Sequence, residues 1–220
     1  MKKIFIFLCA MGMFYSSQAQ NRPGKKYINF GYVSQKISAE EQLAEFKSDF
    51  GAFYSSGKTY FVHPKPIANL INIGIDVTFF DATYAKFSNE GMYSYEDPET
   101  GETITEQGTW DMHKAELGLQ VGPSVHVTIP EGPSVSGYLR YAPAYSMMYE
   151  DDEFSGGFGS LFTSGLTLNY KVFGVGVESR WGKAKHSFSL NVEEMEEQGD
   201  ASLKQTYNLS GMRVFLALRF

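Results

Sequence analysis

Ser124 and His126 combine residue types and a spacing that could support nucleophilic catalysis. Residues two apart on a strand share a face, so the hydroxyl could lie beside an imidazole that acts as its general base. The pair falls near the end of a predicted strand, and we expect it to face inward only if the register breaks at Pro123. No Gly-rich phosphate loop, HExxH motif or paired-histidine motif accompanies it. The sequence therefore predicts no catalytic residue, no cofactor-binding site and no metal site.

Charged residues at alternate strand positions form a second candidate set. They have the opposite parity to the apolar residues of the same strands, so they would share one side of a sheet. In a closed barrel they could form an ion or proton path, or a plug in which acids and bases neutralise one another. We favour the plug, because an eight-stranded barrel is just wide enough inside for side chains and an unpaired buried charge is costly. The predicted interior charge network is Asp76, Glu116, Arg140, Glu178, Arg180 and Arg213.

Acidic residues gather in three predicted loops, 86–110, 150–156 and 187–206, which together carry a net charge of −13. Hard cations take clustered oxygen ligands, so these loops could bind Ca²⁺ or Mg²⁺, including ions that bridge lipopolysaccharide. No segment has EF-hand spacing. We favour a solvated surface whose like charges keep exposed strand edges from associating.

The elements that must position these residues are strands with a period of two. From Ile71 to Phe79, for example, apolar residues alternate with polar or small ones. The same alternation predicts four hairpins, although the register of the second strand is not determined. The predicted strands lie within residues 27–36, 47–62, 70–86, 110–128, 135–149, 157–170, 175–181 and 212–220.

The final strand, Met212–Phe220, keeps this alternation to its last, aromatic residue. Such a strand would present a bare apolar edge to water in an open sheet, whereas a closed barrel has no edge. One parity would then face lipid and the other the interior. We therefore predict an all-β fold, an eight-stranded antiparallel up-and-down transmembrane β-barrel.

Connection lengths predict how the barrel is oriented. Short turns should face the periplasm together with both termini, and long, partly hairpin-like loops should be extracellular. Turn signals within two loops predict that the third and fourth strands, and the seventh and eighth, project beyond the membrane. The predicted short turns are 63–69, 129–134 and 171–174, and the long loops are 37–46, 86–109, 150–156 and 187–206. The predicted interfacial aromatic residues are Tyr27, Tyr84, Trp110, Tyr149, Tyr170 and Trp181.

The N-terminal segment has the pattern of a secretory signal. Lys2 and Lys3 precede an apolar run and small residues, so we expect cleavage after Ala19, leaving residues 20–220 as one outer-membrane barrel domain. Lipoprotein processing at Cys9, the only cysteine, is less favoured because the residues before it match a lipobox poorly. Without this segment the net charge is −8, which argues against nucleic acid as a partner.

The Lys-Lys-plus-apolar start ending in SSQAQ, the alternating strands and the final VFLALRF resemble small outer-membrane β-barrel proteins of Bacteroidetes, and more broadly OmpX and OmpA-type barrels. This resemblance implies an outer-membrane location and no enzymatic activity. Phe220, with Leu218 and Leu216, resembles the signal read by the barrel-assembly machinery.

These observations lead to three functional hypotheses. The favoured one is a non-enzymatic barrel whose hairpins bind something at the cell surface or another envelope protein, since exposed ladders can recruit a partner strand. The alternatives are a narrow porin-like channel for small solutes or ions and a barrel enzyme acting on lipid A. Outer-membrane lipid, lipopolysaccharide and the barrel-assembly machinery are the other expected partners.

Overall fold

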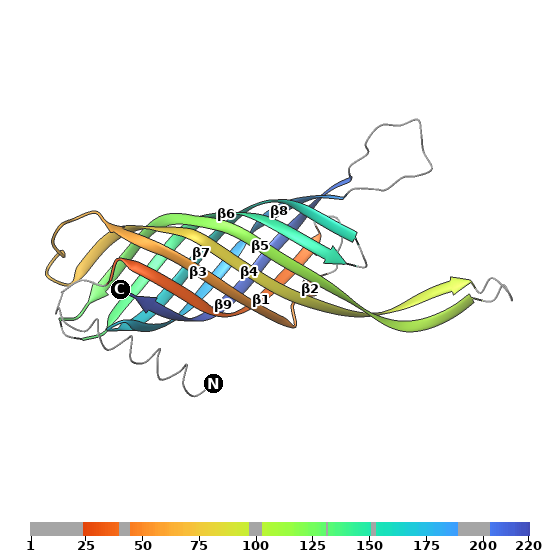
Figure 1. The fold of residues 1–220 in the computed structure, drawn as a ribbon, viewed down its shortest axis with the longest axis horizontal. Coiled ribbons are helices and arrows are strands. Elements are labelled where there is room, and N and C mark those ends of the chain that lie inside the picture. The colour runs from red at the N-terminus through yellow and green to blue at the C-terminus, as the bar shows by residue number, and fades with distance from the viewer. Residues whose placement is uncertain (1–23, 40–44, 97–102, 131, 151–152, 189–202) are drawn as a thin grey trace, which may run out of the picture.

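The computed structural model describes residues 24–39, 45–96, 103–130, 132–150, 153–188 and 203–220. They form one antiparallel sheet in the order β2-β1-β3-β4-β5-β6-β7-β8-β9, which closes into a ring where β1 pairs with β9 (Figure 1). The strands are β1 (Lys26–Ala39), β2 (Glu45–Lys47), β3 (Phe50–Phe61), β4 (Ile71–Glu96), β5 (Thr103–Thr128), β6 (Ser134–Glu150), β7 (Glu153–Tyr170), β8 (Phe173–Phe188) and β9 (Leu203–Arg219).

Two of these elements, β2 and β3, share a single place in the wall. Both pair with β1, and they are separated only by Ser48 and Asp49. Ser48 keeps the ladder continuous, because its hydroxyl accepts a hydrogen bond from the Gln35 amide at 2.8 Å. The barrel therefore has eight wall strands, which confirms the predicted fold class.

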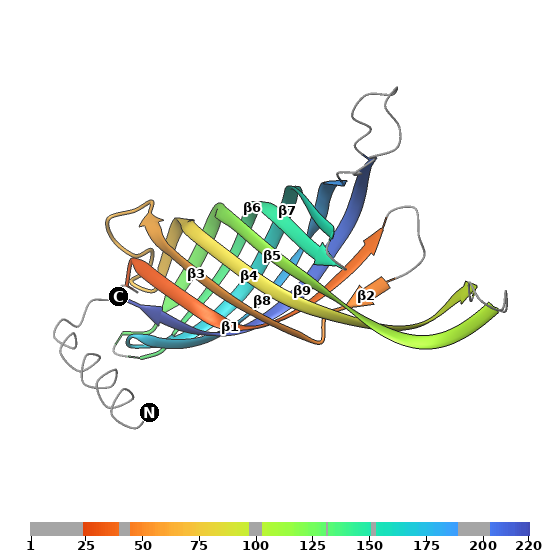
Figure 2. The ribbon, with the colours of Figure 1, turned by 45° about the vertical axis from the view of Figure 1, so that its right-hand side comes forward.

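The two ends of the barrel differ in how far the strands extend. The connections 62–70, 129–133 and 171–172 lie at the end where the C-terminus lies, called the terminus end below (Figure 1). At the opposite end β4 and β5 continue past the last pairs that join them to their other neighbours, Phe50–Lys86 and Met112–Glu150. The continuation, residues 89–96 and 103–110, is called the ribbon, and its end of the barrel the ribbon end (Figure 2).

Alternating side chains separate the interior from the outer wall. On β9, Met212 and Val214 are 59% and 58% exposed, whereas Arg213 between them is fully buried. The apolar residues of one parity thus form an outward belt around the barrel, and polar residues fill the interior. Within the described residues, no helix has the length and apolar character needed to cross a membrane.

A β-bulge interrupts the alternation on β4. Thr78 pairs with Gln120 and Asp81 with Gly118, so β4 carries one residue more than β5 between these pairs. Phe79 and Phe80 therefore both face outward, at 53% and 47% exposure. The bulge turns Asp81 inward, although uninterrupted alternation from Ile71 would have placed it on the outer face.

The predicted aromatic girdle is wrong at Tyr27. This side chain is 2% exposed and lies inside the barrel, where its hydroxyl is 2.8 Å from Thr78 Oγ1. The reason is parity, since its neighbours Ile28 and Phe30 face outward. The outward and exposed members of the predicted set are Tyr84, Tyr149, Tyr170 and Trp181. The side chain of Trp110 lies outside the described residues.

One predicted loop differs from the structure. Segment 150–156 is not a long loop, because β6 ends at Glu150 and β7 begins at Glu153. β8 stays paired with β7 and β9 up to Phe188, and residues 189–202 of the predicted loop 187–206 lie outside the described residues, so the projection of that hairpin beyond the membrane stays a prediction. The predicted signal segment, residues 1–19, lies outside the described residues.

Apolar side chains fill the interior toward the ribbon end. This layer comes from seven of the eight wall strands, and Phe46 and Tyr207 pack against it. Its buried members are Ile37, Ala85, Phe87, Met112, Ala142, Ala144, Met148, Leu161, Ala184 and Leu209.

Candidate functional site

Nearest the terminus end, the interior polar residues gather around Asp76. Arg140 Nη2 donates to its Oδ2 at 2.6 Å, and Thr59 Oγ1 donates to Oδ1 at 2.6 Å. Ser124 Oγ donates to the same Oδ1 at 2.9 Å. Asp76 is fully buried, so these donors compensate the loss of water around its charge.

The middle of the interior is organised by Arg213. Its Nη1 lies 3.0 Å from Asp81 Oδ1 and 2.9 Å from Glu178 Oε1, and its Nη2 lies 3.2 Å from Asp81 Oδ2. Tyr138 also donates its hydroxyl to Glu178, at 2.7 Å. The guanidinium group of Arg140 lies 3.5 Å from the centre of the Tyr138 ring, which connects this cluster to the one around Asp76.

Arg180 continues the network toward the ribbon end. Its Nη1 is 3.4 Å from Asp81 Oδ2 and 3.0 Å from Glu116 Oε2. Glu116 also accepts from Lys114, and Gln35 Nε2 lies 3.3 Å from its Oε2. Ion pairs therefore connect Arg213, Arg180 and Lys114 through the carboxylates between them, and the Tyr138 side chain links this group to the Asp76–Arg140 pair.

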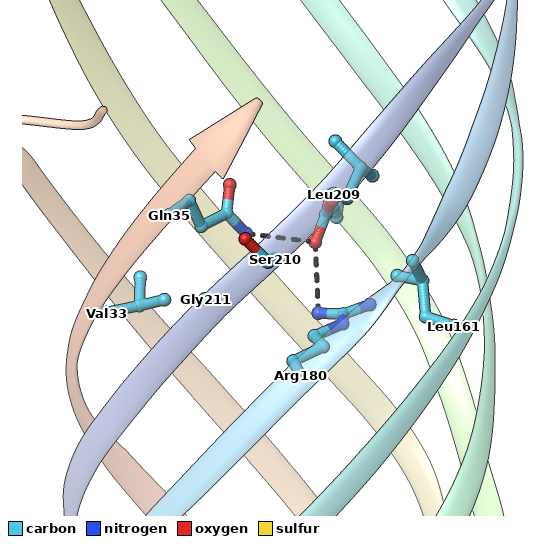
Figure 3. A pocket seen from close by; sticks show the side chains of 8 residues that line it. Val33, Gln35, Leu161, Arg180, Leu209, Ser210 and Gly211 are labelled. Atoms are coloured by element: carbon cyan, nitrogen blue, oxygen red, sulfur yellow. Dashed lines mark hydrogen bonds and ion pairs between the residues drawn. The ribbon is translucent and has the colours of Figure 1, made fainter. Parts of the chain in front are cut away.

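A small cavity lies at one place beside these charged side chains. Its volume is about 10 Å³, and it lies next to Gln35 and Arg180 (Figure 3). That volume suits a single water molecule. The cavity is lined by Val33, Gln35, Glu116, Leu161, Arg180, Leu209, Ser210 and Gly211.

The structure places all six residues of the predicted interior charge network inside the barrel and brings them together. Sequence reasoning missed Asp81, Lys114 and Arg219, which are also buried there. Lys114 and Arg219 have the inward parity of Glu116 and Arg213, so alternation alone could have identified them. Asp81 is inward only because of the bulge, for which the sequence gives no separate signal.

The pair Ser124 and His126 faces inward without any break at Pro123, because β5 keeps one register from Gly118 to Thr128. The expectation of a break was wrong. Ser124 Oγ lies 3.0 Å from His126 Nε2, but Asp76 contacts that same hydroxyl, and Nδ1 faces Ser136 at 2.7 Å. A nucleophile, base and acid must follow one another in that order. Here the imidazole and the carboxylate both meet the serine, and none of the three side chains exceeds 1% exposure.

Hydrogen bonds fasten the base of the ribbon to the wall. Asp49 Oδ2 accepts from the Ser88 amide at 2.8 Å, and Ser88 Oγ donates to Asp111 Oδ1 at 2.7 Å. Lys86 Nζ lies 2.6 Å from Asp111 Oδ2. The Lys86 ammonium, and after it the Ser88 hydroxyl, hold the pKa of Asp111 below its usual value. The Asp111 carboxylate in turn raises the pKa of Lys86.

Most residues of the acidic loops have side chains outside the described set, so their proposed cation binding stays a prediction. Among the side chains that the structure does describe, no group of three His, Cys, Asp or Glu residues could hold a metal ion. Leu216, Leu218 and Phe220 lie on the outward face of the last strand, and their role as an assembly signal also stays a prediction.

No protein-family model and no curated protein matches the chain in sequence. Solved structures with a similar fold include the outer membrane protease OmpT from Escherichia coli, with a TM-score of 0.51 and 10% identity over 94% of this chain and 99% of that one. Neisserial surface protein A has a TM-score of 0.46 and 12% identity over 90% of this chain and 99% of that one. Ail of Yersinia pestis, solved with a heparin analogue, has a TM-score of 0.40 and 12% identity over 90% and 100%. The likeness to OmpT shows the barrel fold alone, and the other two are too distant to support an argument.

Proposed function

We propose that this chain is a non-enzymatic barrel of the bacterial outer membrane that presents its ribbon at the cell surface to a protein partner. The observation that carries the proposal is the ribbon itself. Eight successive pairs, from Asn89–Trp110 to Glu96–Thr103, join β4 to β5 beyond the closed wall. At about 3.3 Å per residue the ribbon extends roughly 25 Å. Within the described residues neither of its outer edges pairs with another strand, so each can accept a strand from a partner.

The outward belt supports the membrane location. On β8, Phe173 and Trp181 are both exposed and lie eight residues apart, which corresponds to roughly 20 Å along the axis of tilted strands. That height is close to the apolar band of about 25 Å in outer-membrane barrels. OmpT, which has a similar fold, is an outer-membrane protein. Short connections are typical of the periplasmic end of such barrels, which supports the proposal that the terminus end faces the periplasm and the ribbon faces outward.

The filled interior supports a role without transport or catalysis. The charged side chains from Asp76 to Lys114, linked in part through the Tyr138 ring, and the apolar layer on their ribbon side occupy space that a solute would need. The only nucleophile–base pair that the sequence suggested, Ser124 and His126, is buried within this filling. Membership of the Bacteroidetes group and recognition of Phe220 by the assembly machinery belong to this proposal and are supported by the sequence resemblance.

The test is a tagged pull-down from solubilised native outer membranes, using the full chain and a variant without the ribbon. In that variant an Asn-Gly turn replaces residues 90–109, because Asn89 and Trp110 face each other and a two-residue turn can join such a pair. An unboiled and a boiled gel lane verify that both proteins remain folded barrels.

We expect a stoichiometric protein to co-purify with the full chain and to be lost from the ribbon-deleted variant. If both proteins purify with the same companions, or if the full chain purifies alone, the ribbon does not recruit a protein partner. A change in the lipid A profile on expression would contradict the non-enzymatic part of the proposal.

A further inference from the structure

Aromatic side chains form a continuous strip on the outer face of β6 and β7. Three register pairs of these antiparallel strands each set a tyrosine of β6 opposite a phenylalanine of β7. All six side chains face outward and are between 38% and 76% exposed. The pairs, called the aromatic strip below, are Tyr141–Phe162, Tyr145–Phe158 and Tyr149–Phe154.

The rings of the strip contact one another across the two strands. The ring centroids of Tyr145 and Phe158 are 5.1 Å apart, and those of Tyr141 and Phe162 are 5.5 Å apart. Gly156 lies on the outer face two residues before Phe158, and a Cβ there would lie 2.5 Å from the Tyr145 hydroxyl oxygen. The Tyr145 side chain therefore extends over β7 and takes the place that a side chain at position 156 would need. The two strands thus share one aromatic surface.

The strip extends beyond the apolar belt toward the ribbon end. Phe162 is the register partner of Trp181, the belt residue nearest the ribbon end on β8. Phe154 lies eight residues further toward that end, which corresponds to roughly 20 Å along the axis of tilted strands. Between these two levels, Phe158 is the register partner of the exposed Lys185. A charged side chain on the outer face is costly within the apolar band, so the position of Lys185 indicates that Phe158 lies beyond the band.

Acyl chains of the membrane therefore cover only part of the strip. They can cover the pair Tyr141–Phe162, whereas the other two pairs lie at the level of headgroups and water. Exposed apolar surface of this kind typically marks an interaction site. An occupant of the whole strip has to extend from the apolar band into the aqueous layer, so it must itself be a membrane protein of similar height.

We infer that the aromatic strip is the interface between two copies of this chain, related by a twofold axis along the membrane normal. The inference rests on the proposed outer-membrane location and not on a partner for the ribbon. A twofold axis in this direction sets the strip against itself and keeps it at the same height in both copies.

The size of the strip agrees with a dimer interface. Six aromatic side chains that are on average about half exposed offer roughly 600 Å² in each copy, and so roughly 1,200 Å² in the pair. Stable interfaces bury about 1,200–2,000 Å², so the strip alone reaches the lower end of that range. Tyrosine and phenylalanine are also enriched at the centres of protein interfaces.

The test measures association of the full chain in phosphatidylcholine vesicles by energy transfer between donor-labelled and acceptor-labelled copies, as lipid is added in increasing excess. The dyes are attached through Lys65→Cys at the terminus end. The strip variant is Phe158→Ser, because this ring is the most exposed of the six, at 76%.

The matched control is Phe50→Ser. Phe50 is 54% exposed at the ribbon end of β3, which lies three and four places from β6 and β7 in the ring of eight wall strands. An unboiled and a boiled gel lane verify that each variant is a folded barrel.

We expect the unchanged chain to associate and Phe158→Ser to dissociate at much lower lipid excess. A twofold interface loses two rings with each substitution, so the dissociation constant should rise at least about a hundredfold. Phe50→Ser and the ribbon-deleted variant should associate as the unchanged chain does. The inference is overturned if the unchanged chain is monomeric, if Phe158→Ser associates normally, or if Phe50→Ser or the ribbon deletion weakens association as much.

Two further outcomes separate this inference from other occupants and from the function on which it rests. If the chain is monomeric in vesicles, and Phe158→Ser loses a different membrane protein that co-purifies from native membranes, the strip binds that protein and not a second copy. If the chain fractionates with the outer membrane but is monomeric, only the dimer fails. If the chain is absent from that membrane, the proposed function fails whatever the energy transfer shows.

Discussion

Replacing Arg213 by Met should destabilise the barrel more than any other removal of a single interior charge. Arg213 is fully buried and contacts both carboxylates of the central cluster. Without it, Asp81 keeps Arg180, at 3.4 Å, and the Gln120 side chain, and Glu178 keeps the Tyr138 hydroxyl, at 2.7 Å. Removing one partner of a buried ion pair typically costs about 3–5 kcal/mol, and methionine fills much of the vacated volume, so we expect a loss in that range.

Arg219→Met is the matched control. Arg219 is also buried and also lies near an aromatic ring, 5.3 Å from Tyr27 compared with 4.4 Å between Arg213 and Phe53. Its hydrogen bonds go to Thr59 and His126, and the nearby Asp76 carboxylate keeps its ion pair with Arg140 when Arg219 is removed. Neutral partners of this kind contribute about 1 kcal/mol each, so Arg219→Met should cost at most about 2 kcal/mol.

The assay is urea unfolding of the barrel in lipid vesicles, followed by tryptophan fluorescence and by the gel shift between unboiled and boiled samples. Adding Glu178→Gln to Arg213→Met removes one orphaned charge and should recover about 1–2 kcal/mol. The reasoning is refuted if Arg213→Met costs less than about 1 kcal/mol, or if Arg219→Met costs as much as Arg213→Met.

Three further predictions concern the bulge, the base of the ribbon and the interior. Deleting Phe79 removes the bulge and leaves Phe80 as the one outward residue between Thr78 and Asp81, so Asp81 stays inward and the protein should still yield a heat-modifiable band; loss of that band would show that the bulge itself is required for folding. Because the folded-state pKa of Asp111 is lowered, its contacts with Lys86 and Ser88 should be complete above the ordinary aspartate pKa of about 3.9 and disappear only as the pH falls through the lowered value. The carboxyl NMR signal of Asp111 should therefore change only as the pH falls below that ordinary value, and a change already near neutral pH would contradict the assignment. In planar bilayers the chain should show no stable conductance, whereas discrete channel openings would favour the porin-like alternative.

The outer wall could be predicted from the sequence because apolar residues at every second position of a strand must share one face. In a sheet with one lipid-facing side, that face is the outer one. On β9 the alternation holds at every residue from Met212 to Phe220, and each side chain lies on its expected face. Tyr27 was assigned to the interfacial girdle for its residue type although the parity of Ile28 and Phe30 pointed the other way. Parity was the more reliable guide, because a slip of one residue would reverse every side chain of the strand.

The contacts within the interior could not be predicted in the same way. Phe79 and Phe80 form the bulge, and either of them would suit the outer face alone. The sequence therefore gives no sign that both face outward and that Asp81 turns inward. The short break at Ser48 and Asp49, which divides β2 from β3, likewise has no proline or glycine to mark it. Which acid meets which base depends on the stagger of the closed ring, a property that no single strand contains.

Cysteine labelling of intact cells would test the central claim most directly, because the only native cysteine, Cys9, lies in the predicted signal segment. Two variants are needed, Gln107→Cys in the ribbon and Lys171→Cys at the terminus end. A membrane-impermeant maleimide should label Gln107→Cys on intact cells and Lys171→Cys only after the outer membrane is breached. Labelling of Lys171→Cys on intact cells, with Gln107→Cys protected, would contradict a barrel that presents its ribbon at the cell surface.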